Sequence, residues 1–159
     1  MKKILFLASI FIILSCSNEN STAAELVTDD IIVSNLQVWT DTKETALTTL
    51  GKPNTTSQVY NEIDDLNLTV WTYGKSELHF DKEYIYSFII NDESINLTKL
   101  TLLNIGLSEE RLELFIKKNN LEYIRGSNSI RFPIKDTIYY LTIRLLEEKI
   151  SEISIWQDN

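Results

Sequence analysis

The chain of 159 residues contains a single cysteine, Cys16, and a single histidine, His79. These two side chains could carry out reactions or bind groups that the other residue types do not. A cysteine can pack in a core, react as a thiolate, bind a metal or carry a lipid. A disulfide needs a second cysteine, and a metal site needs more ligands than one cysteine and one histidine supply. Packing and anchoring remain open for Cys16, and its neighbours distinguish the two.

Cys16 lies at the end of an apolar segment and the start of a polar one. Met1, Lys2 and Lys3 form a short basic start, and Ile4–Leu14 follow as eleven residues of which only Ser9 is polar. This segment is shorter than the ~20 residues that span a bilayer, and it has the length of a signal-peptide core. The sequence Ile-Leu-Ser-Cys at its end resembles the bacterial lipobox, which implies cleavage between Ser15 and Cys16 and acylation of Cys16. Two or more acyl chains, such as palmitate, give stable membrane anchoring.

The alternative for Cys16 is a buried thiol at the start of a core helix. Polar residues follow it at once and no amphipathic period continues, so we expect an anchor. Residues 16–35 are mostly small, polar and acidic, a composition that favours a disordered tether. The residue after Cys16 is not the Asp of an inner-membrane retention signal, which favours the outer membrane of a bacterial envelope.

The charge is acidic and unevenly distributed. The formal net charge is −8; residues 36–98 hold 10 acidic and 4 basic side chains (−6), and residues 99–159 hold 9 of each (0). An acidic chain without a basic stripe argues against nucleic-acid binding and against adhesion to anionic lipid. The acidic first part instead suits a basic protein partner.

A shift of 66 residues aligns similar features of residues 36–92 and 102–158. Each copy begins with a short amphipathic helix, capped by Asp41 or Thr42 in the first and Ser108 in the second. Alternating strands follow, with short turns that favour antiparallel hairpins. We expect strands near 58–63, 66–73, 76–81, 84–91, 121–125, 129–134, 137–146 and 149–157.

These elements predict an α+β fold with two tandem helix-plus-antiparallel-sheet units of about four strands each. The expected organisation is a lipoprotein signal peptide, the lipidated Cys16 with its tether, and two αβ repeat units, with boundaries at 1–15, 16–35, 36–98 and 99–159.

The first copy resembles the αβ repeat of the β-lactamase-inhibitor-protein-like and BamE (SmpA/OmlA)-type small lipoprotein superfamily. In that repeat a helix ends in Leu-Gly-x-Pro and is followed by Trp-x-Tyr-Gly and a strand ending in Phe; the matching residues are Leu50, Gly51, Pro53, Trp71, Tyr73, Gly74, Leu78 and Phe80. The second copy lacks these motifs. The resemblance implies a non-enzymatic module that binds proteins, in inhibitors through the exposed face of the sheet.

His79 is the natural centre for any chemistry in the folded part of the chain. Alternation places Glu77, His79 and Asp81 on one face of a strand, opposite Leu78 and Phe80. These acids could raise the histidine pKa or hold a metal with it; alternatively, His79 is an exposed histidine among solvated acids. Nucleophile motifs, phosphate-binding glycine loops and the HExxH motif do not occur. We therefore predict no catalytic residue, metal or cofactor.

Strand aromatics on the face opposite the expected core indicate a protein-binding surface, because exposed Trp, Tyr and Arg are typical of interface hot spots. The alternative is that both faces of the sheet are partly covered. The predicted binding residues are Trp71, Tyr73, His79, Tyr140, Arg144 and Trp156.

Three functions follow in order of preference. The first is a lipid-anchored envelope protein that inhibits or neutralises a protein partner, as an immunity protein does. The second is an accessory structural lipoprotein of outer-membrane assembly. The third is an enzyme or metal binder centred on His79.

Overall fold

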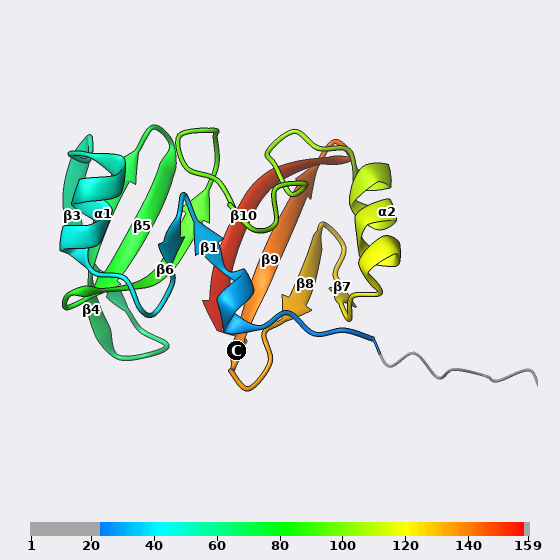
Figure 1. Ribbon diagram of the computed structural model, residues 1–159, viewed down its shortest axis with the longest axis horizontal. Coiled ribbons are helices and arrows are strands. Elements are labelled where there is room, and N and C mark those ends of the chain that lie inside the picture. The colour runs from blue at the N-terminus through cyan, green and yellow to red at the C-terminus, as the bar shows by residue number, and fades with distance from the viewer. Residues whose placement is uncertain (1–22, 158–159) are drawn as a thin grey trace, which may run out of the picture.

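The computed structural model describes residues 23–157, with the side chain of Trp156 excepted (Figure 1). The expected cleavage and lipidation site, Ser15 and Cys16, lies outside these residues. Within them, no helix combines the length and the apolar character needed to cross a bilayer.

Eight antiparallel strands form the main sheet in the order β3-β4-β5-β6-β10-β9-β8-β7. The strands are β3 (Thr55–Asn61), β4 (Leu66–Tyr73), β5 (Ser76–Asp81), β6 (Tyr84–Ile90), β7 (Ile124–Arg125), β8 (Ser129–Pro133), β9 (Tyr139–Leu146) and β10 (Lys149–Gln157). Two meanders, β3 to β6 and β7 to β10, thus share one sheet, and β3 and β7 are its edges.

Tight turns fix the register of these hairpins. Two residues, Gly74 and Lys75, join β4 to β5, and Glu147 and Glu148 join β9 to β10. Both glutamates have positive φ (51° and 60°), as a type I′ turn requires. Gly74 has φ +61°, and an added Cβ there would lie 2.5 Å from Oδ2 of Asp92, so glycine is required on both grounds.

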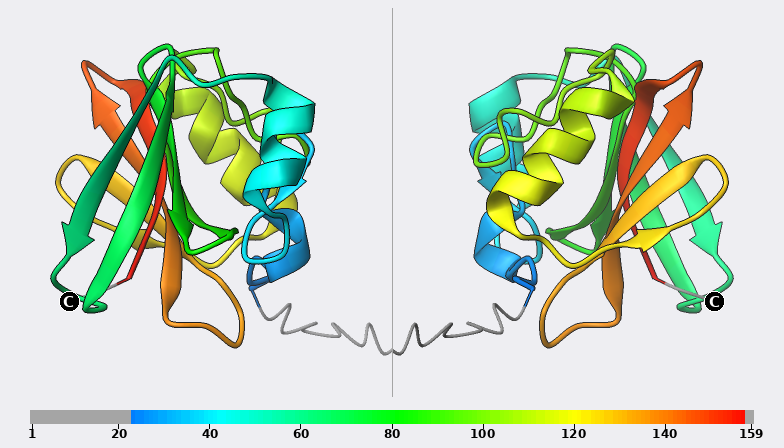
Figure 2. Two further views of the ribbon diagram at one scale, coloured as in Figure 1. Left: turned by 90° about the vertical axis from the view of Figure 1, so that its left-hand side faces the viewer. Right: turned by 90° about the vertical axis from the view of Figure 1, so that its right-hand side faces the viewer.

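Both helices, α1 (Lys43–Leu50) and α2 (Glu109–Asn119), lie on the same side of the sheet (Figure 2). A two-stranded sheet of β1 (Ile32–Val33) and β2 (Leu36–Gln37) lies on this side with them. We call this side the covered face. Its buried strand side chains include Leu78, Phe80, Phe88, Ile130, Phe132, Leu141, Ile143, Ile153 and Ile155, and the helices add Ala46, Leu112 and Ile116. One continuous apolar core results.

The helix ends follow the sequence signals closely. The hydroxyl of Thr42 accepts a hydrogen bond from the backbone N–H of Thr45 (3.3 Å), which caps the start of α1. Gly51 ends that helix at φ +76°, and Asn120 ends α2 in the left-handed conformation. Ser108 takes the N-cap position of α2 as predicted, without a side-chain capping hydrogen bond.

The predicted fold class is wrong. The described strands do not form two separate helix-plus-sheet units; they form one eight-stranded sheet in a mostly β structure, with a small two-stranded sheet beside it. Backbone pairing of β6 with β10, through Ile90 with Ile153 and Ile89 with Ser154, joins the meanders. Periodicity located the individual strands, but it carries no information about which strands pair across a long connection.

The predicted tether also needs correction, because residues 23–35 pack on the domain. Ala24 bridges Leu121, and the Leu26 backbone bridges Ile134. A 3-10 turn at Thr28–Asp30 precedes β1, and Leu26, Ile31 and Val33 are fully or almost fully buried. These apolar side chains belong to the continuous core. The polar average composition of residues 16–35 concealed them.

Candidate functional site

The sheet face opposite the helices carries a surface that we call the open face. Cross-strand neighbours share a face, and one row runs Glu77–Ile89–Ser154–Thr142–Arg131 from β5 to β8. The register places the following described side chains on it: Val59, Leu68, Val70, Glu77, His79, Ser87, Ile89, Arg131, Tyr140, Thr142, Arg144, Glu152 and Ser154. Neither α-helix covers this side (Figure 2).

An apolar groove of about 640 Å³ crosses the open face between β3 and β6. Its apolar walls come from three strands, with Val59 on β3, Leu68 and Val70 on β4 and Ile89 on β6, and Ile63 joins them from the β3–β4 turn. Glu62 and Glu77 are the charged residues that line it, and no lysine or arginine does. The groove therefore suits an apolar ligand surface that carries positive charge.

His79 lies in the floor of this groove, buried at 5% exposure rather than exposed among solvated acids. Its Nε2 atom lies 2.9 Å from Oε2 of Glu77, and its Nδ1 atom lies 3.1 Å from the hydroxyl of Ser87. The predicted proximity to Glu77 is thus present. A neutral ring protonated at Nε2 donates to Glu77 and accepts from the Ser87 hydroxyl, which satisfies all three groups.

A serine, a histidine and a glutamate in one hydrogen-bonded chain are the residue types of a hydrolase triad. Ser87 is only 4% exposed and does not line the groove, so a substrate in the groove meets His79 and not the hydroxyl. The backbone of Ser87 lies within a paired strand, opposite His79. In addition, residues 23–157 contain no cluster of three metal-ligating side chains. The chain of hydrogen bonds fixes the floor of the groove.

The other half of the open face is more basic. The Arg144 side chain is 60% exposed, and its Nε lies 3.3 Å from Oε1 of Glu152. The Arg131 guanidinium lies 5.5 Å from the ring centroid of Tyr140, in cation–π range. The acidic groove lies over β3 to β6, whereas half-buried Arg131 on β8 and exposed Arg144 on β9 lie at the other end, so the two ends of the open face carry opposite charges.

The six predicted binding residues do not share one face. The open face carries His79, Tyr140 and Arg144. The covered face carries Trp71 and Tyr73, so the predicted position of these two residues on the binding surface needs correction. The ring centroid of Trp71 lies 4.8 Å from that of Phe80, and the Tyr73 hydroxyl donates to the Gly51 carbonyl (3.1 Å). The backbone of Trp156 pairs with Tyr140. Both faces of β4 carry large apolar side chains, so alternation alone could not assign Trp71 and Tyr73.

Sequence reasoning missed a polar aromatic cluster that ties the β3–β4 turn to β9. The Tyr86 hydroxyl donates to Asp64 and accepts from the Tyr139 hydroxyl (3.2 Å). Burial, together with the hydrogen bond to Asp64, raises the pKa of Tyr86 above its ordinary value of 10.0. Trp39 packs on Tyr139, with centroids 5.4 Å apart. No local motif joins these residues, because they lie far apart in the sequence.

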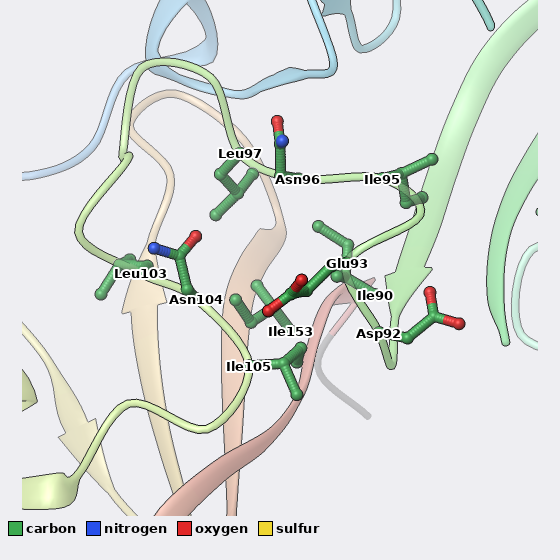
Figure 3. Close-up of a pocket in the computed structure, with 10 residues that line it drawn as sticks. All are labelled: Ile90, Asp92, Glu93, Ile95, Asn96, Leu97, Leu103, Asn104, Ile105 and Ile153. Carbon is green, nitrogen blue, oxygen red and sulfur yellow. The ribbon is translucent and has the colours of Figure 1, made fainter. Parts of the chain in front are cut away.

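A second, smaller pocket of about 340 Å³ lies where β6 and β10 meet (Figure 3). Ile90 and Ile153 come from the paired strands, and Ile95, Leu97, Leu103 and Ile105 come from the connection that follows β6. This pocket is where the two meanders share their core.

Asp92, at the rim of that pocket, holds the surrounding backbone. Its carboxylate accepts hydrogen bonds from the hydroxyls of Ser94 and Ser76 and from the backbone N–H of Lys75 (2.6 Å). The Ser94 hydroxyl, followed by the other donors, lowers the pKa of Asp92 well below its ordinary value of 3.8. Asp92 thus links the β4–β5 turn to the connection after β6.

Comparison with known proteins shows the fold and no family. No family model and no curated protein matches the chain. An extracellular protein containing an SCP domain from Bacillus anthracis is similar in structure, with a TM-score of 0.52, 14% identity and 92% of this chain covered. The chain spans 50% of that protein. A DUF4309 family protein from Bacillus subtilis has a TM-score of 0.42 and 12% identity over 77% of this chain and 82% of its own. Neither is described as a β-lactamase-inhibitor-like or BamE-type protein.

Proposed function

We propose that the chain is a lipid-anchored bacterial envelope protein that binds another protein through its open face, without catalysis, to inhibit or neutralise it. The observation that carries the proposal is the open face itself: a wide sheet surface with an apolar groove and no helix over it. Exposed apolar surface of this kind is typical of an interaction site.

The charges of the open face determine which kind of partner surface it matches. Glu62 and Glu77 line the groove, and exposed Arg144 lies beyond it on β9. A partner with a basic and apolar surface over the groove, and acidic groups over Arg144, matches both ends. Such complementarity accelerates association and sets the orientation of the complex.

The resemblance of residues 36–92 to the inhibitor-like superfamily is consistent with this function, because inhibitors of that superfamily bind through a sheet face. Its Trp-x-Tyr-Gly motif serves a different purpose in this chain, since Trp71 and Tyr73 pack the covered face. The motif therefore supports the local fold, and the binding proposal depends on the open face.

The experiment uses the tagged full-length lipoprotein to isolate a partner from native envelopes, followed by affinity measurement with the purified partner. The Tyr140→Ala/Arg144→Ala variant should bind at least about tenfold more weakly, since interface Tyr and Arg are common hot spots. Leu114→Ala is the control, because Leu114 is 61% exposed on α2, away from the open face. Equal affinity for the double variant would overturn the proposal. A partner from the outer-membrane assembly machinery would assign the accessory role instead of inhibition.

Anchoring is tested separately. We expect Cys16→Ala to abolish incorporation of labelled palmitate and to release the protein from membranes, because the thiol is the acylation site in a lipobox. Ser17→Ala is the matched control and should label normally. Undiminished labelling of the Cys16 variant would contradict the anchor.

A further inference from the structure

The outer edge of β3 is unusually accessible for a strand of seven residues. The strand lies at the end of the main sheet, and within residues 23–157 no other strand pairs with its outer side. Six of its residues, from Thr55 to Tyr60, are exposed. Alternate backbone N–H and C=O groups of an edge strand point away from its neighbour and remain available to another strand.

Devices that normally protect a sheet edge do not occur in β3. Its sequence, TTSQVYN, contains no proline and no charged residue, and all seven residues pair with β4 without a bulge. The opposite edge differs: β7 has only two residues, and Arg125 forms ion pairs with Glu109 and Glu113. One edge is short and charged, and the other is long and uncharged.

Apolar side chains flank the outer edge of β3 on both faces. Val59 is 46% exposed on the open face, next to buried Leu68, and Tyr60 is 53% exposed on the other face. Ile63 extends the apolar surface into the turn that follows the strand. A strand added beside β3 would bury Val59 and extend the groove wall.

The charged residues of the turn at the end of β3 are of one sign. Between Lys52 and Lys75 the chain contains Glu62, Asp64 and Asp65 and no basic residue. All three acids lie in the β3–β4 turn, at the end of the edge strand. A second copy would bring a second acidic half, since residues 36–98 carry a net charge of −6 (10 acidic, 4 basic). A basic segment brings the opposite charge.

We propose that β3 receives an extended segment of the protein partner as a ninth strand, with apolar residues against Val59 and a basic residue beside Glu62, Asp64 and Asp65. This proposal rests on the function proposed above and specifies how the partner is bound. Strand addition of this kind takes affinity from backbone hydrogen bonds and specificity from alternate side chains.

The test measures hydrogen–deuterium exchange of the full-length protein with the peptide Ac-Lys-Val-Thr-Val-Thr-Val-Lys-NH2. Lysine at both ends places a basic residue at the acidic turn in either strand direction. We expect saturable binding and slower exchange at residues 55–61. The first control peptide has N-methylated valines, so it keeps the positive charge but loses backbone hydrogen-bond donors. The second has glutamate in place of lysine, so it keeps the backbone donors but loses the positive charge. Neither control peptide should slow exchange in β3.

Val59→Lys places a cation at the edge and should weaken binding of the peptide by roughly tenfold or more. Tyr60→Lys is a second edge variant, and Ile124→Lys is the matched control, because Ile124 is 40% exposed in the other edge strand. The Tm of each variant verifies folding. Three results would overturn the proposal. The N-methylated peptide could protect β3 equally, the peptide could bind both edge variants as it binds the wild type, or self-association could protect β3 without any peptide.

Affinity for the isolated partner separates this proposal from the function on which it rests. If Val59→Lys binds the partner normally and Tyr140→Ala/Arg144→Ala does not, strand addition is wrong and open-face binding stands. If both variants bind normally, the proposed function fails as well.

Discussion

Nε2 of His79 lies 2.9 Å from Oε2 of Glu77, two residues earlier on the same strand, so the only histidine of the chain is held by an acidic neighbour on the open face. The other ring nitrogen lies 3.1 Å from Ser87. This arrangement makes His79 part of the sheet surface that supports the groove.

We expect His79→Ala to reduce the free energy of unfolding by about 1–3 kcal/mol, because it leaves the buried Ser87 hydroxyl without this partner. Urea denaturation of the variant and the wild-type protein measures the loss. Glu77→Gln should cost less, because its side chain is 37% exposed and its amide can be hydrated. An unchanged midpoint for His79→Ala would show that the hydrogen-bonded chain contributes no stability.

Gly74→Ala should destabilise the fold by roughly 1–2 kcal/mol or more, because alanine is strained at φ +61° and its Cβ would collide with the Asp92 carboxylate. Gly106→Ala is the matched control. Gly106 also has a positive φ (+85°), but no atom lies within 4 Å of an added Cβ. Thermal unfolding should therefore show the larger loss at position 74, and equal losses at both positions would contradict the close approach of Asp92.

Asp92→Asn should lower stability at neutral pH by about 1 kcal/mol, because the charged carboxylate accepts hydrogen bonds from Ser94, Ser76 and Lys75. The pKa of Asp92 is depressed in the folded state, so the folded state favours the ionised form. Its stabilisation is present above the unfolded pKa and is lost as the pH falls through the lower folded pKa.

The difference between wild type and Asp92→Asn should accordingly shrink as the pH falls below 3.8, the ordinary carboxyl value. Urea midpoints at neutral pH and at two acidic pH values measure it. Ser94→Ala removes the leading donor and should reduce the same pH dependence. If the stability difference between wild type and Asp92→Asn grew as the pH fell, the proposed role of the ionised carboxylate would be contradicted.

Trp71→Ala should lower the free energy of unfolding by roughly 2–4 kcal/mol without changing partner affinity in the folded variant, because Trp71 packs on Phe80 under the covered face. Chemical denaturation and binding to the isolated partner provide the two readouts. A stable variant with weakened binding would place Trp71 in the interface, as the sequence pattern alone indicates.

Local features of this fold were predictable from sequence, and long-range ones were not. The turn residues Gly74 and Lys75 and the strands on either side of them were located correctly, because turn chemistry and alternation are local signals. The pairing of β6 with β10 brings Ile90 opposite Ile153, which are far apart in the sequence. The periodicity of hydrophobic residues does not indicate that pairing. Residues 23–35 were misassigned because a few buried apolar residues lie within a polar segment.

The candidate site divides in the same way. Glu77 and His79 were placed on one face by alternation, and the structure agrees. Ser87 completes their hydrogen-bonded chain from the next strand, which alternation along one strand cannot identify. Alternation could not assign Trp71 and Tyr73 correctly because β4 carries large apolar side chains on both faces, and only the position of α1 decides which face is covered.

Site-specific photo-cross-linking in native envelopes tests the central claim, binding through the open face, most directly. A photoreactive residue replaces exposed Arg144 or Val59 on the open face, or exposed Leu47 or Leu114 on the helices. We predict one discrete cross-linked protein from the open-face positions and none from the helix positions. Cross-links to the same protein from Leu47 or Leu114, with none from Arg144 or Val59, would contradict the account.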